Sequence, residues 1–426
     1  MSYRRRATQF QDLPEEIVFA QILTRLPSKD IGRCRAVSTS WRSATSTPEF
    51  MLEHHRRQPL LPIVDGHGMP TGYAVFRDAG AGTSSQQLRP FLTGSDCFEN
   101  DFGIFASCDG FLIIWCRTRL YICNPVIRSH ALLPLPSYGQ GFMNIVIGFY
   151  RHHPTKDYRV LLVSESEKCS KYSLHNLTVG SDESRHLTIK MPAGSSPSVE
   201  RKLLKGLRNL DHCPPPVQHR GSLHWCPHGA SKITKGGGDI IVFDTEAESF
   251  RWMRSPTKRR YNRKLFNMKG TLAFWGTSTP DFTAINVWVM QDYEAEVWAL
   301  KYRIDVSMLE ASRKLYLTSF KKKRKKKTPL HSPVQWFDDM AVLNDRELLI
   351  KFNGKYVLRC DIDGKFLGIV NLGTCQYLMS LTQHRFQESI VPIPYHEIQE
   401  EDAESPFSEC SGFLLCFAFR LRRCLL

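Results

Sequence analysis

Close cysteine pairs, a long hydrophobic run and a cleavable leader are all missing from this 426-residue sequence. The 13 cysteines are an odd number, and Cys108, Cys116 and Cys123 lie seven or more positions apart, unlike the close pairs of structural zinc sites. The longest apolar run, residues 412–419, is too short to cross a bilayer. Because the start MSYRRRATQF has no apolar signal region, we expect free thiols, a reducing compartment and no membrane partner.

The chain has almost no excess of positive over negative charge outside two short runs. The 57 Lys and Arg exceed the 42 Asp and Glu by 15. Residues 251–264 and 321–327 carry seven positive charges each and no acid, so the rest of the chain is nearly neutral. This distribution argues against a protein with a basic surface spread over the whole fold, as nucleic-acid binding would require.

Local signatures of catalysis, phosphate binding and metal binding are also missing. No Gly-x-Ser-x-Gly occurs, and residues 235–239 (KGGGD) lack the spaced glycines and Lys-Ser/Thr pair of a phosphate loop. His224, Cys226 and His228 alternate along one strand, but Pro227 interrupts them and no second ligand pair follows. We therefore predict no metal, no cofactor and no catalytic residue, while a Cys-His or Ser-His-Asp site assembled in space stays open.

The stretch from Asp12 to Phe50 is dense in signals for short helices. Asp12 and Glu15 form an Asp-x-x-Glu capping box, and Pro27 ends the helix that follows. An apolar stripe runs along that helix at Leu13, Ile17, Phe19, Ile22, Leu23 and Leu26. Further helix starts are predicted at Ser28, at Ser38 or Ser40, and at Thr47 with Pro48. A unit this small cannot bury all its apolar side chains, so we expect an exposed surface for a protein partner.

The order LPEEI, ILTRLP, RCRAVSTSWRS and PEF in this stretch resembles the F-box motif in the form common among plant F-box proteins. The resemblance implies a module that docks on the Skp adaptor of a cullin ubiquitin ligase. The matching positions, which in the family form the docking face or its support, are Leu13, Pro14, Ile17, Ile22, Leu23, Leu26, Pro27, Cys34, Val37 and Trp41. The alternative is that the stripe is only the core of a small helical domain.

Short apolar strands bounded by turn residues follow from about residue 101. A unit of Gly-x-Leu with aromatics, then a strand ending in Asp or Asn, then an aromatic strand, appears about four times, as in residues 221–253. Residues 144–164 contribute two more strands across a Pro-containing turn. Repeated antiparallel units of this kind predict a β-propeller, with a β-sandwich as the alternative.

The segments SCDGFL, YICNP and HHPTKDYRVLLV resemble the F-box-associated domains of plant proteins. That resemblance implies that the β domain holds the substrate of the ligase through loops on its top face. The sequence singles out no substrate-binding residue.

The predicted architecture is thus multidomain, with a small all-α module followed by a large all-β antiparallel domain. Its segments are a disordered basic lead (1–9), the F-box helical module (10–56), a connector with first edge strands (57–100), the propeller-like domain (101–398) and an acidic, then Cys-rich tail (399–426).

The basic run inside the β domain is a candidate nuclear import signal, because import receptors recognise dense basic clusters in exposed loops. Its residues are Lys321, Lys322, Lys323, Arg324, Lys325, Lys326 and Lys327. The alternative is a solvated loop without a receptor, since seven like charges stay exposed in either case. We expect the protein in the cytoplasm, the nucleus or both.

These expectations describe the substrate-recognition subunit of a Skp-cullin-F-box ubiquitin ligase with no catalysis of its own. Its partners would be a Skp-type adaptor, through it a cullin, and a protein substrate that the sequence does not identify. Two other classes stay open: a propeller enzyme, and a nucleic-acid-binding protein that uses the basic loops.

Overall fold

The computed structural model describes part of the chain, on which all structural statements below rest. The described residues are 14, 17–66, 71–77, 87–94, 102–116, 119–134, 142–166, 172–181, 184–187, 203, 206–207, 215–227, 240–257, 263–268, 270–277, 284–319, 337–343, 346–353, 356–370 and 379–394. No helix among them is both long and apolar enough to cross a membrane.

Five short helical segments form the N-terminal module: η2 (Val18–Ile22), η3 (Leu23–Arg25), α2 (Ser28–Val37), α3 (Thr39–Thr45) and α4 (Pro48–Arg57). The Ser38 hydroxyl caps α3 by accepting a hydrogen bond from Trp41 N at 3.3 Å, and Thr47 caps α4 through Phe50 N at 3.3 Å. Ser28 is not a cap, because Pro27 occupies that position. The first segment is a π-helical turn followed by a 3₁₀ turn, where the sequence predicts a regular helix.

Twenty-four described strands form six antiparallel four-stranded sheets. The first sheet contains β24 (Met379–Gln387), β1 (Leu60–Gly66), β2 (Thr71–Arg77) and β3 (Gln87–Gly94); the second β4 (Phe102–Cys108), β5 (Phe111–Cys116), β6 (Arg119–Asn124) and β7 (Ser129–Leu132). The third contains β8 (Phe142–Arg151), β9 (Tyr158–Ser166), β10 (Tyr172–Thr178) and β11 (Ser184–His186); the fourth β12 (Val217–His219), β13 (Ser222–Trp225), β14 (Ile240–Asp244) and β15 (Ser249–Met253). The fifth contains β16 (Arg263–Met268), β17 (Thr271–Thr277), β18 (Ala284–Asp292) and β19 (Val297–Asp305); the sixth β20 (Phe337–Val342), β21 (Glu347–Phe352), β22 (Tyr356–Asp361) and β23 (Phe366–Ile369).

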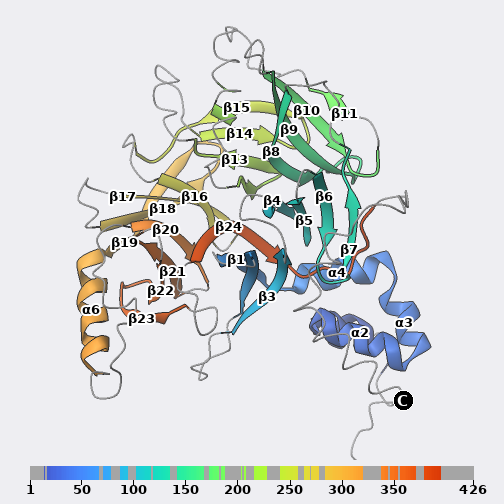
Figure 1. Ribbon diagram of the computed structural model, residues 1–426, viewed down its shortest axis with the longest axis horizontal. Coiled ribbons are helices and arrows are strands. Elements are labelled where there is room, and N and C mark those ends of the chain that lie inside the picture. Colours follow the sequence, from blue (N-terminus) through green and yellow to red (C-terminus); the bar gives the residue numbers. More distant parts are fainter. Residues whose placement is uncertain are drawn as a thin grey trace, which may run out of the picture.

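The six sheets are the blades of a closed propeller, as Figure 1 shows. Strand β24 pairs with β1, so one blade combines strands from both ends of the domain and closes the ring. The inner strands β24, β4 and β8 contact one another in sequence around the axis. The propeller prediction is confirmed, and the sandwich alternative is wrong. Residues 57–100, which the sequence assigns to a connector with edge strands, carry three strands of the closing blade.

Apolar side chains fill the space between each pair of neighbouring blades. Among the described residues, one hydrophobic cluster joins every adjacent pair, including the sixth blade with the first. Since each sheet is covered on both faces, strands in the middle of a sheet carry continuous apolar runs, as in Phe111–Cys116 of β5 and residues 240–243 of β14. Trp225 also ties two blades by a hydrogen bond, from its Nε1 to the Ile147 carbonyl at 3.0 Å.

A recurring turn joins the third and fourth strands of several blades. Asp244 Oδ1 accepts hydrogen bonds from the backbone of residues 246 and 247, and Asp292 repeats this with residues 294 and 295. The fourth residue after each Asp has positive φ, 48° at Glu248 and 55° at Glu296. The Asp that ends a strand in the sequence repeat is therefore the residue that closes this turn.

Helix α6 (Val306–Ser319) lies between the fifth and sixth blades in the sequence. Figure 1 shows it at the rim, on the opposite side of the ring from α2 and α3. It packs against β23, and the Ser312 hydroxyl accepts a hydrogen bond from Phe366 N at 3.0 Å. The basic run Lys321–Lys327 comes next in the chain and lies outside the described residues.

Candidate functional site

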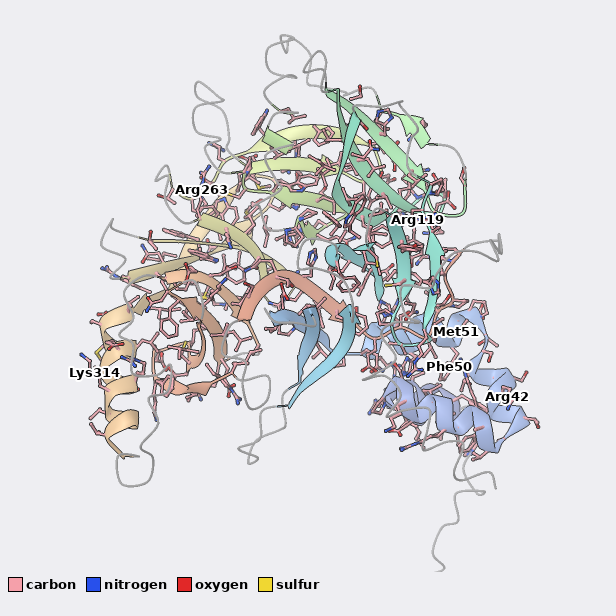
Figure 2. The ribbon with its side chains drawn as sticks, viewed as in Figure 1. Arg42, Phe50, Met51, Arg119, Arg263 and Lys314 are labelled. Carbon is pink, nitrogen blue, oxygen red and sulfur yellow. The ribbon has the colours of Figure 1, made fainter. Side chains whose placement is uncertain are left out.

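The core of the N-terminal module includes one residue from the far end of the chain. Val18, Leu23, Ile31 and Phe50 are buried together with Ile390, which follows β24. Figure 2 shows Phe50 on the side of the module nearer the propeller and Arg42 towards its outer side. The segment after β24 therefore completes the apolar core that the short helices cannot close alone.

Hydrogen bonds hold the same segment to the helices. Ser28 N donates to the Glu388 carboxylate at 3.4 Å, and His55 Nδ1 donates to the Glu388 carbonyl at 2.9 Å. On the propeller side, Asn124 Nδ2 donates to the Ser389 and Val391 carbonyls at 3.0 and 2.8 Å. Residues 388–394 thus bridge the helices and the second blade.

A second connection runs through the end of α4. His54 Nε2 and Gln58 Nε2 both donate to the Leu26 carbonyl, at 2.8 and 3.2 Å, which satisfies the acceptor where η3 ends. Burial lowers the pKa of His54, so the ring is neutral at physiological pH. Gln387 Nε2 in turn donates to the Gln58 carbonyl at 2.8 Å. Because α4 runs almost directly into β1, the helical module has a fixed orientation on the propeller.

The outer surface of the module keeps apolar side chains that neither the helices nor the propeller cover. Val37 is 79% exposed and Ile17 is 44% exposed, both large fractions for branched aliphatic residues. Pro14 and Pro27 are exposed as well. Exposed apolar residues on a small helical module make it a candidate for a protein interaction site.

The structure describes nine of the ten sequence-predicted docking residues, and these fall into three groups by exposure. Pro14, Ile17, Pro27 and Val37 are exposed, and Ile22, Leu26, Cys34 and Trp41 are half-buried. Leu23 is only 1% exposed, so it supports the surface from beneath and cannot touch a partner. Leu13 lies outside the described residues.

Sequence periodicity misses two core residues of this module, Val18 and Phe50. The π-helical turn at Val18–Ile22 changes the angular spacing of the side chains, so Val18 faces the core and Ile17 faces outwards. Phe50 follows the Thr47-Pro48 helix start, which is the signal that could have placed it on the first turn of α4.

Comparison with known proteins identifies both parts. Residues 91–325, more than half of the chain, match the family described as F-box associated beta propeller domain. The chain belongs to this family. Residues 10–57, which contain the five described helical segments of the N-terminal module, match the F-box-like family.

Several curated F-box proteins of Arabidopsis thaliana are similar to this F-box protein over most of their length. F-box protein At3g07870 is 26% identical over 315 residues, which cover 69% of this chain and 73% of the relative. F-box protein At5g65850 is 26% identical over 310 residues, 67% of this chain and 69% of the relative. F-box protein At5g18160 is 30% identical over a shorter stretch of 171 residues, 38% and 42% of the two chains.

The basic run at residues 251–264 is partly neutralised in the described part of the structure. Arg251 and Arg254 pair with Glu296 at 3.2 and 3.0 Å, and Lys264 pairs with Asp339 at 2.7 Å. These cations therefore link neighbouring blades and are less available for phosphate groups than the sequence alone indicates.

The candidate metal ligands have other partners. His224 is fully buried, with Nδ1 3.0 Å from the Val217 carbonyl and Nε2 2.8 Å from the Tyr293 hydroxyl. Burial lowers the pKa of His224 to about 4. His228 lies outside the described residues, and within them no three His, Cys, Asp or Glu side chains are grouped as metal ligands.

Proposed function

We propose that this F-box protein is the substrate-recognition subunit of a Skp-cullin-F-box ubiquitin ligase. The helical module binds a Skp-type adaptor and through it a cullin, and the propeller binds the protein to be ubiquitinated. The observation that carries the proposal is the exposed apolar surface at Ile17 and Val37, on a module that residues 388–394 fix to the propeller.

A fixed connection between the two domains suits this role. Ubiquitin transfer is accelerated when a target lysine is held near the loaded enzyme, so the rate depends on the position and orientation of the target. A receptor can supply that effect by binding alone. We accordingly assign the protein no catalytic step of its own.

Adaptor binding gives a direct test. Replacing Val37 with Asp is expected to weaken the affinity for a Skp-type adaptor at least about tenfold, because the interface would bury an unpaired charge. Val37 is largely exposed in the free protein, so folding should be unaffected. Calorimetric titration of the full-length chain with purified adaptor measures the affinity.

The matched control is Val297→Asp, an exposed valine on β19 in the fifth blade. It introduces the same charge away from the helical module and should bind the adaptor as tightly as the wild type. Equal affinity for the wild type and Val37→Asp, or no binding by the wild type, would contradict the proposed docking surface.

We also propose that the run Lys321–Lys327 directs the protein into the nucleus. Replacing Lys322, Lys323, Arg324 and Lys325 with Ala is expected to shift a fluorescent fusion from the nucleus to the cytoplasm, because the dense cluster that import receptors recognise is lost. Quantitative imaging measures the ratio of nuclear to cytoplasmic fluorescence. A control with the exposed Lys301, Arg303 and Lys314 changed to Ala should keep the wild-type distribution, and an unchanged ratio in the first variant would refute the signal.

A further inference from the structure

The axial channel of the propeller contains a cavity of about 270 Å³. Three of its lining residues, Leu60, Asp109 and Gln387, lie at the end of the propeller where α4 leads into β1. Phe149 and Phe266 from two inner strands line its interior. The volume is close to the lower end of the range for small-molecule sites, which run from about 300 to 1,000 Å³.

One wall of the cavity is a distorted part of β24. The pairing of β24 with β1 shifts between Leu381 and Arg385, which marks a β-bulge. Within the bulge Gln383 has φ of 62°, a conformation that a non-glycine residue rarely adopts. The bulge brings the consecutive residues Gln383, His384 and Arg385 to the cavity wall. Bulges next to binding sites commonly redirect side chains in this way.

Arg385 lines the cavity without a carboxylate partner. Its Nη1 donates to the Val342 carbonyl at 2.9 Å, and no described Asp or Glu oxygen lies within 4.0 Å of its side-chain nitrogens. Burial lowers the pKa of Arg385 to about 10, so the guanidinium is still charged at neutral pH. The Arg385 side chain is half-buried, so an anion bound beside it would supply the counter-ion that the described chain does not.

An acidic group on the inner strand β20 is already paired with another residue. Asp339 on β20 accepts a hydrogen bond from Lys264 Nζ at 2.7 Å and another from Gln383 Nε2 at 2.6 Å. Asp109, which also lines the cavity, accepts a hydrogen bond from the Tyr158 hydroxyl at 3.0 Å and remains an anion. Within the described residues, however, neither Asp109 nor Asp339 lies within ion-pairing distance of Arg385.

His384 adds a second polar group to this wall. Its Nε2 donates to the Ile104 carbonyl at 3.0 Å, which leaves Nδ1 as a buried acceptor with no described partner. The amide side chains of Gln218 and Asn267 also line the cavity, and the other surfaces are mostly aromatic and aliphatic. Besides the carboxylate of Asp109, the lining thus offers one cation, a few neutral polar groups and apolar walls, which suit a small anion with an apolar body.

We propose that the axial cavity binds a small organic carboxylate, with the carboxylate on the Arg385 guanidinium and the apolar body against Phe149 and Phe266. A guanidinium pairs with a carboxylate through two parallel hydrogen bonds, which gives strong and oriented binding at a desolvated site. This site is distinct from the adaptor-binding surface and does not depend on it.

Thermal unfolding of the full-length chain tests the proposal, with benzoate as the probe. At one hundred times its Kd, benzoate should raise the Tm of the wild type by about 3 °C, whereas neutral benzamide should leave it unchanged. Arg385→Met, which keeps the side-chain length and removes the charge, should abolish the benzoate shift. The control Arg263→Met removes a buried arginine of the inner strand β16 that does not line the cavity, and should keep the shift (Figure 2 labels Arg263).

If Arg385→Met fails to fold, Arg385→Lys serves in its place, since lysine keeps the positive charge but cannot donate two parallel hydrogen bonds to one carboxylate. It should bind benzoate at least about fivefold more weakly than the wild type. A wild-type Tm that 10 mM benzoate does not change, or a shift that the available Arg385 variant retains in full, would overturn the proposal. A Tm shift with inorganic phosphate and none with benzoate would overturn the assignment of the ligand as a carboxylate.

Discussion

Replacing Gly110 with alanine is expected to destabilise the protein by at least ~3 kcal/mol. Gly110 has φ of +82°, in the left-handed region that disfavours a side chain. A Cβ there would also stand 2.3 Å from the Ser389 Cβ and 2.7 Å from the Gln387 carbonyl oxygen. Both neighbours lie where β24 continues into residues 388–394, so the substitution also displaces the segment that holds the helical module. Urea denaturation followed by tryptophan fluorescence measures the loss.

Gly221 provides a matched control in the equivalent turn of the fourth blade. Its φ is +68°, but a Cβ would meet nothing within 4 Å. Gly221→Ala should therefore lower the free energy of unfolding by only roughly 1–2 kcal/mol, the cost of a left-handed backbone conformation for a residue with a side chain. Hydrogen exchange should show faster opening of α4 in the Gly110 variant alone. Equal losses for the two variants would mean that the contact with Ser389 does not restrain the module.

Replacing Glu248 with alanine is expected to cost about 3 kcal/mol. The Glu248 carboxylate joins the third and fourth blades by accepting hydrogen bonds from Arg159, Tyr150 and Arg185. The Arg159 side chain is only 13% exposed, so without Glu248 it would be left as an uncompensated buried charge. Chemical denaturation measures the loss.

Glu296 occupies the same position of the same turn in the fifth blade and serves as the control. Its partner Arg254 is 72% exposed and can return to water when the carboxylate is removed. Glu296→Ala should therefore cost no more than about 1 kcal/mol. Equal losses for Glu248→Ala and Glu296→Ala would show that partner burial does not decide the effect.

The free energy of unfolding should also decrease at acid pH, because Glu248 becomes protonated. Burial by itself would raise the pKa of Glu248, but hydrogen bonds from Arg185, Tyr150 and Arg159 outweigh it and lower the pKa below 4.5. The group thus stabilises the fold fully above pH 4.5, and the contribution is lost as the pH falls through the lower folded-state pKa. Denaturation midpoints of wild type and Glu248→Gln should converge in this acid range. A constant difference would contradict the assignment.

Local sequence patterns predicted many of the strands and turns of the β domain. The Asp that ends a strand predicts a turn because its carboxylate can accept two backbone hydrogen bonds, and Asp244 and Asp292 do so. Patterns failed at β1 and β24, whose sequences are interrupted by Pro, Gly or polar residues, whereas the strand at residues 73–76, inside β2, is predicted from sequence. Strands β1 and β24 are stabilised by pairing across more than 300 positions of sequence, as in Leu61 with Phe386, which no local window contains.

The sequence by itself determined that a set of short F-box helices precedes a β-propeller, because helix caps, turn residues and apolar runs act over a few neighbouring positions. Only the tertiary structure decided that Val18 is buried while Ile17 is exposed, that Ile390 completes the helical core, and that Arg385 faces a cavity. These features depend on segments far apart in the chain packing together, and side-chain burial is a property of that packing.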